Sequence, residues 1–334
     1  MKRRATIKNI ADSLNLSTST VSRILNGKGE FSKETTDAVK RVAQMLDYRV
    51  NSLAVSLRKN IPRKVLGVIL PQVNHYFFSS ILNGIMITSH NQGFMVMVGE
   101  SLDQFEKEKE LINNFADHFV SGIILAPSQD KQSALNISKM DREYLPNVVI
   151  DRTFEGKLGS FVRHDDFNGA YKAVSHFIKN GRKKIGIIKG PDRCNISSAR
   201  FEGYKKALKD NDIQYSKSLM RSAPITNKSD GYKFFKDLYE KEQPQAVFTI
   251  TDMLASGVYE YASEKNIEIP KDLAVIGYSN SEISDLLKPK LSTVNQNGFE
   301  MGKMAYEYLM LQIEDPKIKR QMTFESELIL RDSA

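Results

Sequence analysis

The chain has 334 residues, a formal net charge of +8 and a single cysteine, Cys194. This length allows two or three domains of ordinary size. One cysteine excludes a disulfide framework, and the five histidines lack the paired spacing of a metal site. No apolar run follows the basic N-terminal residues, so we expect neither a signal peptide nor a membrane span, and we predict a cytoplasmic protein without a cofactor.

The positive charge is concentrated near the N-terminus. Residues 1–60 contain twelve Lys and Arg against five Asp and Glu, whereas residues 61–334 contain thirty-six against thirty-five. A small basic segment on a nearly neutral body indicates a local polyanionic partner. The phosphate backbone of DNA attracts such a segment through counterion release.

Three short helices are predicted within this basic segment. Thr6, Ser17 and Ser32 each precede apolar residues at helical spacing, so each is expected to be an N-cap. The inward faces are Ile7, Ile10, Ala11 and Leu14; then Val21, Ile24 and Leu25; then Val39, Val42, Ala43 and Leu46. Asn15 tolerates the left-handed turn needed between the first two helices. The pattern predicts a helix-turn-helix unit.

The second helix carries small or forked polar side chains near its N-terminus: Thr18, Ser19, Ser22 and Arg23. Arg23 can make a bidentate contact to guanine, while Thr18 and Ser19 can reach bases or a thymine methyl group. For any single Ser or Thr, a capping or surface role is equally open. The group as a whole favours DNA recognition.

The run Thr20–Asn26, with Leu46–Tyr48, resembles the DNA-binding domain of the lac repressor family of bacterial transcription regulators. The likeness extends over the full 334 residues and is strongest in the first sixty. It implies that Thr18, Ser19 and Arg23 read bases and that Asn26 lies close to the DNA backbone. The candidate DNA contacts in this domain are Thr6, Ser17, Thr18, Ser19, Ser22, Arg23 and Asn26.

Residues 49–60 correspond to the hinge helix of the family, with a plain linker as the alternative. The resemblance implies that Leu57 is a wedge in the minor groove, with Ala54 packed beside it and Arg58 following onto phosphate or the groove. Val50 and Val55 stand where the family usually has Pro and Arg. The hinge is therefore expected to start less sharply and to be less basic.

From Lys64 onward, apolar strands alternate with amphipathic helices, and the pattern restarts at Arg182. Strands are expected at 65–70, 94–98, 122–125, 183–191, 219–222, 246–249 and 273–277, and helices at 77–92, 104–118, 197–211, 229–241 and 252–265. Apolar strands between such helices predict parallel sheets covered on both faces. The fold class is α/β: an all-α helix-turn-helix head with a hinge helix, followed by two doubly wound parallel-sheet lobes.

The resemblance implies a periplasmic-binding-protein-like core in which the chain crosses three times between the lobes, near 163–165, 291–295 and 322–325. The predicted domains are residues 1–48 (DNA-binding), 49–62 (hinge), 63–164 with 294–323 (N-terminal lobe) and 165–293 with 324–334 (C-terminal lobe).

A ligand is expected between the lobes, because open parallel sheets bind ligands beyond the carboxyl ends of their strands. The candidate effector contacts, largely implied by the resemblance, are Phe77, Phe78, Asp165, Asn195, Arg200, Phe248, Asp252, Ser279 and Gln296. Core packing is the alternative for one of the two phenylalanines. For Asp252 a helix cap and a ligand contact are equally open.

Ser279 bears on the ligand, because the family usually has Asp at this position. The family grounds favour a sugar or sugar derivative as the effector. A neutral serine removes a charge-assisted hydrogen bond and also removes repulsion against an anion. With Lys189 and Arg193 nearby in the sequence, a phosphorylated or acidic ligand is the alternative.

Other function classes fit less well. The chain contains no G-x-G-x-x-G, P-loop or G-x-S-x-G motif, and Asp165 and Asp166 are adjacent strand-end residues whose side chains point apart, so we predict no enzyme. A transport receptor with the same core would need a signal peptide. The sequence predicts a ligand-controlled regulator, expected to act as a repressor, that binds a pseudo-palindromic operator as a homodimer. Whether the ligand is an inducer or a corepressor stays open.

Overall fold

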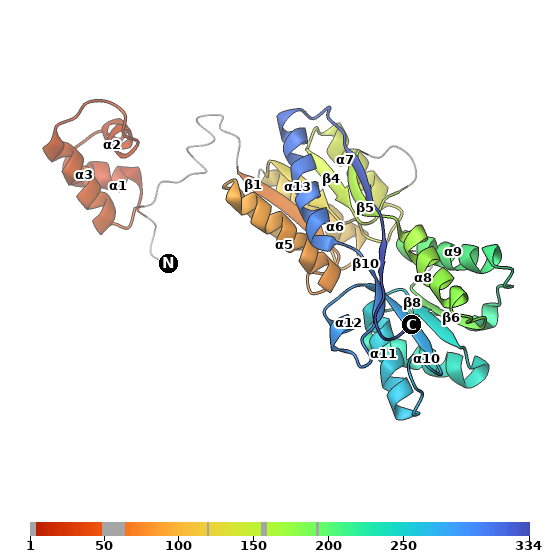
Figure 1. Ribbon diagram of the computed structural model, residues 1–334. Coiled ribbons are helices and arrows are strands. Elements are labelled where there is room, and N and C mark those ends of the chain that lie inside the picture. Colours follow the sequence, from red (N-terminus) through yellow and green to blue (C-terminus); the bar gives the residue numbers. More distant parts are fainter. Residues whose placement is uncertain (1–4, 49–63, 119, 155–158, 192–193) are drawn as a thin grey trace. The chain divides into compact units, whose positions relative to one another are not determined.

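The computed structural model of the chain consists of two compact units, residues 1–63 and 64–334 (Figure 1). It describes residues 5–48, 64–118, 120–154, 159–191 and 194–334. The predicted hinge, with Ala54, Leu57 and Arg58, lies outside the described residues. No helix in the described part is both long and apolar enough to cross a membrane.

The first unit contains the three predicted helices, α1 (Ile7–Leu14), α2 (Thr18–Leu25) and α3 (Lys33–Met45). The predicted N-caps are confirmed: the side chains of Thr6, Ser17 and Ser32 accept hydrogen bonds from the backbone N–H groups of Asn9, Thr20 and Thr35. Asn15 adopts the predicted left-handed conformation, with φ 49° and ψ 40°. These local signals set where each helix begins.

A small apolar core holds the three helices together. Ile10, Ala11, Val21, Ile24, Val39 and Ala43 are buried in it. The prediction that Leu46 packs inward is wrong, because this side chain is 39% exposed. Leu46 is the C-cap of α3, where the helical periodicity that placed it on the inner face has ended.

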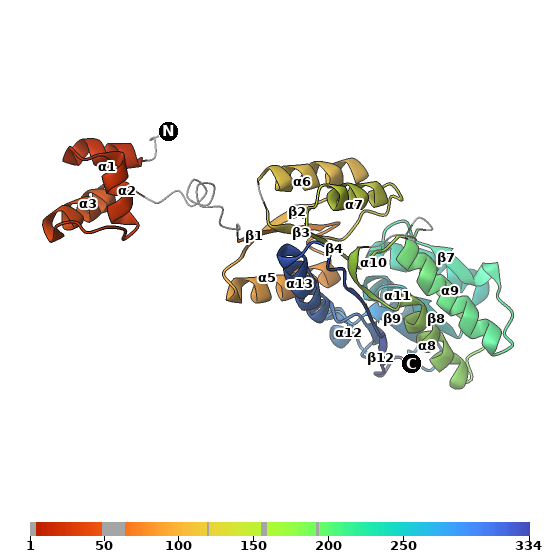
Figure 2. The ribbon, with the colours of Figure 1, turned by 90° about the horizontal axis from the view of Figure 1, so that it is seen from above.

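The second unit begins with a six-stranded sheet in the order β11-β5-β4-β3-β1-β2, in which every pair is parallel. Its strands are β1 (Val65–Leu70), β2 (Met95–Glu100), β3 (Gly122–Leu125), β4 (Asn147–Ile150), β5 (Ser160–His164) and β11 (Gln321–Phe324). Helices α5 (Tyr76–Asn91) and α13 (Gly298–Glu314) cover one face, and α6 (Phe105–Asp117) and α7 (Ser133–Arg142) cover the other (Figure 2).

A second six-stranded sheet has the order β12-β10-β9-β8-β6-β7. Its strands are β6 (Ile185–Lys189), β7 (Met220–Ser222), β8 (Ala246–Thr249), β9 (Ala274–Ser279), β10 (Ser292–Asn295) and β12 (Glu327–Ile329). Helices α8 (Asp166–Lys179) and α9 (Asn195–Asp210) pack together, as do α10 (Lys228–Glu242) and α11 (Asp252–Glu264). A one-turn helix, α12 (Ile283–Leu286), follows β9, and a 3-10 turn, η1 (Lys217–Leu219), precedes β7.

The predicted α/β class with two parallel-sheet lobes is confirmed, with one correction. Strand β12 runs antiparallel to β10, so the second sheet is not wholly parallel. The strand order explains this: β12 enters the sheet directly after β11 of the first sheet, through a short connection and without a crossover helix.

The chain passes between the two sheets at three places. It leaves the first sheet after His164, returns after Asn295 and leaves again after Phe324. Each lobe is therefore built from discontinuous segments, and the two lobes are connected by three chain crossings. Such connections allow the lobes to change their relative orientation as rigid bodies.

Candidate functional site

One face of α2 presents polar side chains to solvent. Its apolar residues Val21 and Ile24 are buried against α1 and α3, which leaves Ser17, Thr18, Ser19, Arg23 and Asn26 exposed. All are among the predicted DNA contacts. The packing of α2 therefore fixes which side of the helix can enter a DNA groove.

Local contacts hold several of these groups in place. The Oγ of Ser17 lies 2.7 Å from the Oγ of Ser19. Asn26 donates from Nδ2 to the carbonyl of Ser22 at 2.7 Å. The guanidinium carbon of Arg23 lies 5.6 Å from the ring centroid of Phe31, which supports an exposed arginine by a cation–π contact.

Thr6 has a second role at the start of α1. It forms a capping box with Asn9, and its backbone N–H donates to the Asn9 Oδ1 at 2.8 Å. The side chain remains exposed. Capping and DNA contact are compatible at this position.

The second unit contains a cavity of about 290 Å³ between the two sheets. Its lining comes from the carboxyl ends of the strands and the segments that follow them: Pro71, Gln72, Leu102, Asp103, Gln129, Asp151 and Arg152 in the first lobe, and Gly190, Pro191, Pro224, Ile225, Thr226, Ile250, Thr251, Ser279 and Gln296 in the second. Side chains of α5 and α9 complete it. This is the carboxyl-end position at which parallel sheets bind ligands.

Five of the nine predicted effector residues line this cavity: Phe77, Phe78, Arg200, Ser279 and Gln296. The two phenylalanines are 4% and 5% exposed, and their ring centroids lie 5.5 Å apart. Both belong to the apolar core of the first lobe as well as to the cavity. Each phenylalanine therefore packs in the core and also lines the cavity.

The other four predicted residues lie elsewhere. Asp165 and Asn195 line an adjoining cavity of about 550 Å³. Phe248 is fully buried in β8 against Tyr278 and does not reach either cavity. Asp252 is buried, bonded to Ser281, and lines neither cavity.

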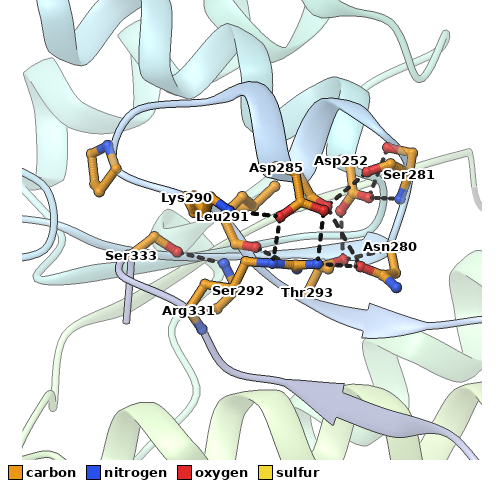
Figure 3. A network of polar contacts seen from close by, with 12 residues as sticks. Asp252, Asn280, Ser281, Asp285, Lys290, Leu291, Ser292, Thr293, Arg331 and Ser333 are labelled. Atoms are coloured by element: carbon orange, nitrogen blue, oxygen red, sulfur yellow. Dashed lines mark hydrogen bonds and ion pairs between the residues drawn. The ribbon is translucent and has the colours of Figure 1, made fainter.

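Asp252 organises the loop that follows β9 (Figure 3). Its Oδ2 accepts from the backbone N–H and the hydroxyl of Ser281, at 2.7 and 2.9 Å, and its Oδ1 accepts from the Thr293 hydroxyl at 2.6 Å. Gly277 passes so close that a Cβ there would lie 2.3 Å from the Asp252 Oδ1. Of the two alternatives left open for Asp252, the helix cap is excluded, because Thr251 caps α11.

Arg200 reaches the cavity from α9 and is buried. Its Nε donates to Asp166 Oδ1 at 2.8 Å, its Nη1 donates to the carbonyl of Ile250 at 2.6 Å, and the guanidinium stacks on Tyr278, 3.6 Å from the ring centroid. Burial lowers the pKa of Arg200, but Asp166, Tyr278 and Asp151 together outweigh it and the net pKa is raised. Arg200 is therefore a fixed, charged wall of the cavity.

Three charged residues of the cavity were not among the predicted effector contacts. Asp103 follows β2, and Asp151 and Arg152 follow β4. Arg152 donates from Nη1 to Asp103 and, at 2.9 Å, to the carbonyl of Pro127. These three residues follow strand ends, which is where ligand contacts are expected in parallel sheets. Asp151, for example, comes directly after β4.

Several residues that line this cavity have a left-handed backbone conformation. Leu102, Asp103, Asp151 and Ser279 all line it and have φ of 53°, 57°, 66° and 118°. A non-glycine residue in such a conformation costs about 1–3 kcal/mol, and this strain is typical of ligand-binding sites. Hydrogen bonds to neighbouring residues fix such conformations. For example, Ser279 Oγ donates to Gln296 Oε1 at 2.8 Å.

Of the two cations suggested by the sequence, only Lys189 lies among the described residues, and it does not line the cavity. Lys189 is buried with its ammonium 5.1 Å from the ring centroid of Phe201, and Arg193 lies outside the described residues. The cationic groups on the cavity are Arg152 and Arg200.

A helix-turn-helix unit joined to a two-lobed core with an interlobe cavity defines a ligand-binding type of DNA-binding regulator. The family comparisons agree: residues 6–51 match the model for bacterial regulatory proteins of the lacI family, and residues 174–334 match a periplasmic binding protein-like domain. The chain belongs to the lacI family of bacterial transcription regulators.

Curated relatives match over nearly the whole chain. The transcriptional repressor CytR of Escherichia coli K12 is 29% identical over 98% of this chain and 96% of its own length. The NTD biosynthesis operon regulator NtdR of Bacillus subtilis 168 is also 29% identical, over 98% and 99%. These relatives are regulators and not enzymes, and the chain is a DNA-binding transcription regulator.

Solved structures share the fold. The lac repressor dimer bound to operator and the anti-inducer ONPF has a TM-score of 0.85, with 22% identity over 99% of both chains. A lacI family regulator from Enterococcus faecium with bound ribose has a TM-score of 0.70, with 27% identity over 81% of this chain and 98% of that one.

Proposed function

We propose that this protein is a sequence-specific repressor whose DNA affinity is controlled by a small molecule bound in the interlobe cavity. The observation that carries the proposal is that one chain contains both an exposed polar face on α2 and a strained, charged cavity between two lobes connected at three places. Binding that changes the lobe orientation would couple the two sites, and such coupling is reciprocal.

The α2 face is proposed to enter the major groove, with Arg23, Thr18 and Ser19 reading bases. Ser17, Ser22 and Asn26 then lie near the backbone, and Thr6 contacts phosphate at the start of α1. The predicted hinge residues Ala54, Leu57 and Arg58 add a minor-groove contact. A cytoplasmic location follows from this function.

A homodimer is proposed, formed in part by an apolar surface on the first lobe. Met86 and Ile87 on α5 are 48% and 49% exposed, and Met95 and Val98 on β2 are 69% and 42% exposed. Strand β2 is the edge of its sheet and packs beside α5. Exposed apolar groups on an edge strand are costly unless a partner covers them. Two copies would place two heads on a pseudo-palindromic operator.

The effector is proposed to be a sugar or sugar derivative. The cavity combines the two phenylalanine rings with arginine, serine and glutamine side chains that suit hydroxyl groups, and its 290 Å³ is near the lower end of the usual range for ligand sites. The ribose bound to the related regulator supports this class. Asp165 and Asn195 would contact a larger ligand through the adjoining cavity.

Binding of the full chain to genomic DNA fragments tests the function. We expect nanomolar affinity for a few fragments that share a pseudo-palindromic sequence, and a change of about 5-fold or more in that affinity when a bound effector is added. A transport receptor with the same core would show no sequence preference for DNA.

A further inference from the structure

Asp151 occupies an unusual position at the end of β4. Its side chain lines both the 290 Å³ cavity and the adjoining 550 Å³ cavity, so it lies where the two meet. The residue is 6% exposed, and its backbone is in the left-handed conformation with φ 66°. The fold therefore holds a buried carboxyl group at the junction of two ligand-sized spaces.

In the part of the chain that the structure describes, this carboxyl group has no close donor. Among the described residues, none donates a hydrogen bond to it, and the nearest cationic atom, the Arg152 Nε, lies 3.8 Å from the Asp151 Oδ2. The Arg152 Nη1 is committed to Asp103 and to the carbonyl of Pro127. The Arg152 Nε is itself buried without a hydrogen-bond partner. Buried charged groups are costly unless they are paired and hydrogen-bonded.

The charges around the two cavities are unequal. In the described lining of the two spaces, carboxylates outnumber guanidinium groups by four to three. The carboxylates are Asp103, Asp151, Asp165 and Asp166, and the guanidinium groups are Arg152, Arg163 and Arg200. Arg152 and Arg200 each have their own carboxylate partner, so neither is available as a free cation for an anionic ligand. Burial lowers the pKa of His75 and of His164 to about 4, which keeps both rings uncharged.

We propose that the effector is a sugar-sized molecule carrying a protonated amino group, and that this group binds the Asp151 carboxylate between the two cavities. This rests on the proposed interlobe effector site. An ammonium group supplies three donors and one positive charge, which meets both the missing hydrogen bonds and the carboxylate excess. A hydroxyl supplies only one donor and no charge, and a phosphate adds repulsion. The phosphorylated or acidic alternative raised by Ser279 is therefore disfavoured at Asp151.

The proton equilibrium of Asp151 supports this assignment. Burial raises the pKa of Asp151 to about 7, while Arg152 and Arg200 oppose the rise and Asp166 and Asp103 add to it. The uncharged rings of His75 and His164 add no positive charge nearby. A bound ammonium would favour the ionised carboxylate, so binding should release a proton at neutral pH.

The test is thermal stabilisation of the full chain by matched sets of sugars. Glucose, galactose and mannose are each offered as the neutral sugar, the 2-amino sugar and the 6-phosphate. We expect an amino sugar to stabilise most, and Asp151→Asn to weaken its binding by about 100-fold. Asp117→Asn, which changes an exposed carboxylate on α6, should leave binding unchanged.

The outcomes are separable. Preferred binding of a neutral or phosphorylated sugar overturns the amino-group inference but leaves the sugar effector in place. Binding by none of the nine compounds contradicts the sugar effector itself, and the inference with it. Calorimetry of the unchanged protein in buffers of different ionisation enthalpy provides a check that needs no variant: absence of proton release on amine binding at pH 7 also overturns the inference.

Discussion

Arg331 donates a hydrogen bond from Nη2 to the Oδ1 of Asn280 at 2.8 Å, and so ties the C-terminal segment to the residue that follows Ser279. The same guanidinium donates from Nη1 to the carbonyl of Leu291 at 2.9 Å (Figure 3). Asn280 and Ser279 both have positive φ, of 51° and 118°. The last residues of the chain therefore help to hold a strained segment at the wall of the cavity.

Replacing this arginine should affect both stability and ligand binding. Arg331→Ala removes charge-assisted hydrogen bonds to Asn280 and Leu291, and we expect unfolding to become easier by about 2–3 kcal/mol. Ser279 should lose its fixed position, so effector affinity should fall as well. Arg142→Ala, on the exposed side of α7, is the control and should change stability by less than about 0.5 kcal/mol. Urea unfolding and calorimetric titration measure the two effects; unchanged stability in Arg331→Ala would show that these contacts carry little energy.

The Arg200–Asp166 pair should show strong coupling. Arg200→Met leaves Asp166 buried without its cation, and we expect a loss of about 3–5 kcal/mol in the free energy of unfolding. Adding Asp166→Asn should recover part of that loss, because it removes the uncompensated charge. Additive effects in the double variant, measured by urea unfolding, would contradict a direct pair.

Asp151 should make the protein less stable as the pH rises. Its pKa is about 7 in the folded state against an ordinary value of 3.8, so the folded state holds the proton more tightly. The resulting stabilisation is present below about pH 4 and is lost as the pH rises through about 7. The melting temperature of the unchanged protein, measured relative to that of Asp151→Asn, should therefore decrease as the pH rises from about 4 to about 7. A constant difference would place the pKa of Asp151 near its ordinary value.

The proposed dimer surface can be tested with charges. Met95→Glu should produce monomers in analytical ultracentrifugation, because a carboxylate on the edge strand β2 would be desolvated in the dimer. Leu135→Glu is the matched control, since Leu135 is 62% exposed on α7, on the other face of the same sheet. A Met95→Glu protein that remains dimeric would exclude this surface from the interface.

Much of the fold could be predicted because its signals are local. The caps at Thr6, Ser17 and Ser32, and the largely apolar strands β1, β3 and β8, depend on neighbouring residues in the chain. The antiparallel placement of β12 could not be predicted, since it depends on which sheet edge is free after the third crossing.

The sequence predicted that the cavity lies at the strand ends. It did not predict which side chains near those ends face the cavity. Phe248 lies near the end of β8, yet the alternation of the strand turns it into the core. Asp252 lies just past the same strand, but Ser281 and Thr293 from distant segments occupy its carboxylate. Asp151 follows β4, a strand that was not among the predicted ones, and its 3.8 Å separation from the Arg152 Nε depends on the folded structure.

Sequence-specific DNA binding by the α2 face is the central property proposed for this protein. Mapping of bound sites across the genome, with the unchanged chain and with Arg23→Ala, tests it. We expect a small set of sites sharing one pseudo-palindromic sequence, and a loss of about 1–3 kcal/mol at one base pair of each half-site in the variant, with nonspecific binding retained. Uniform occupancy without a shared sequence, or an identical site preference in Arg23→Ala, would contradict the account.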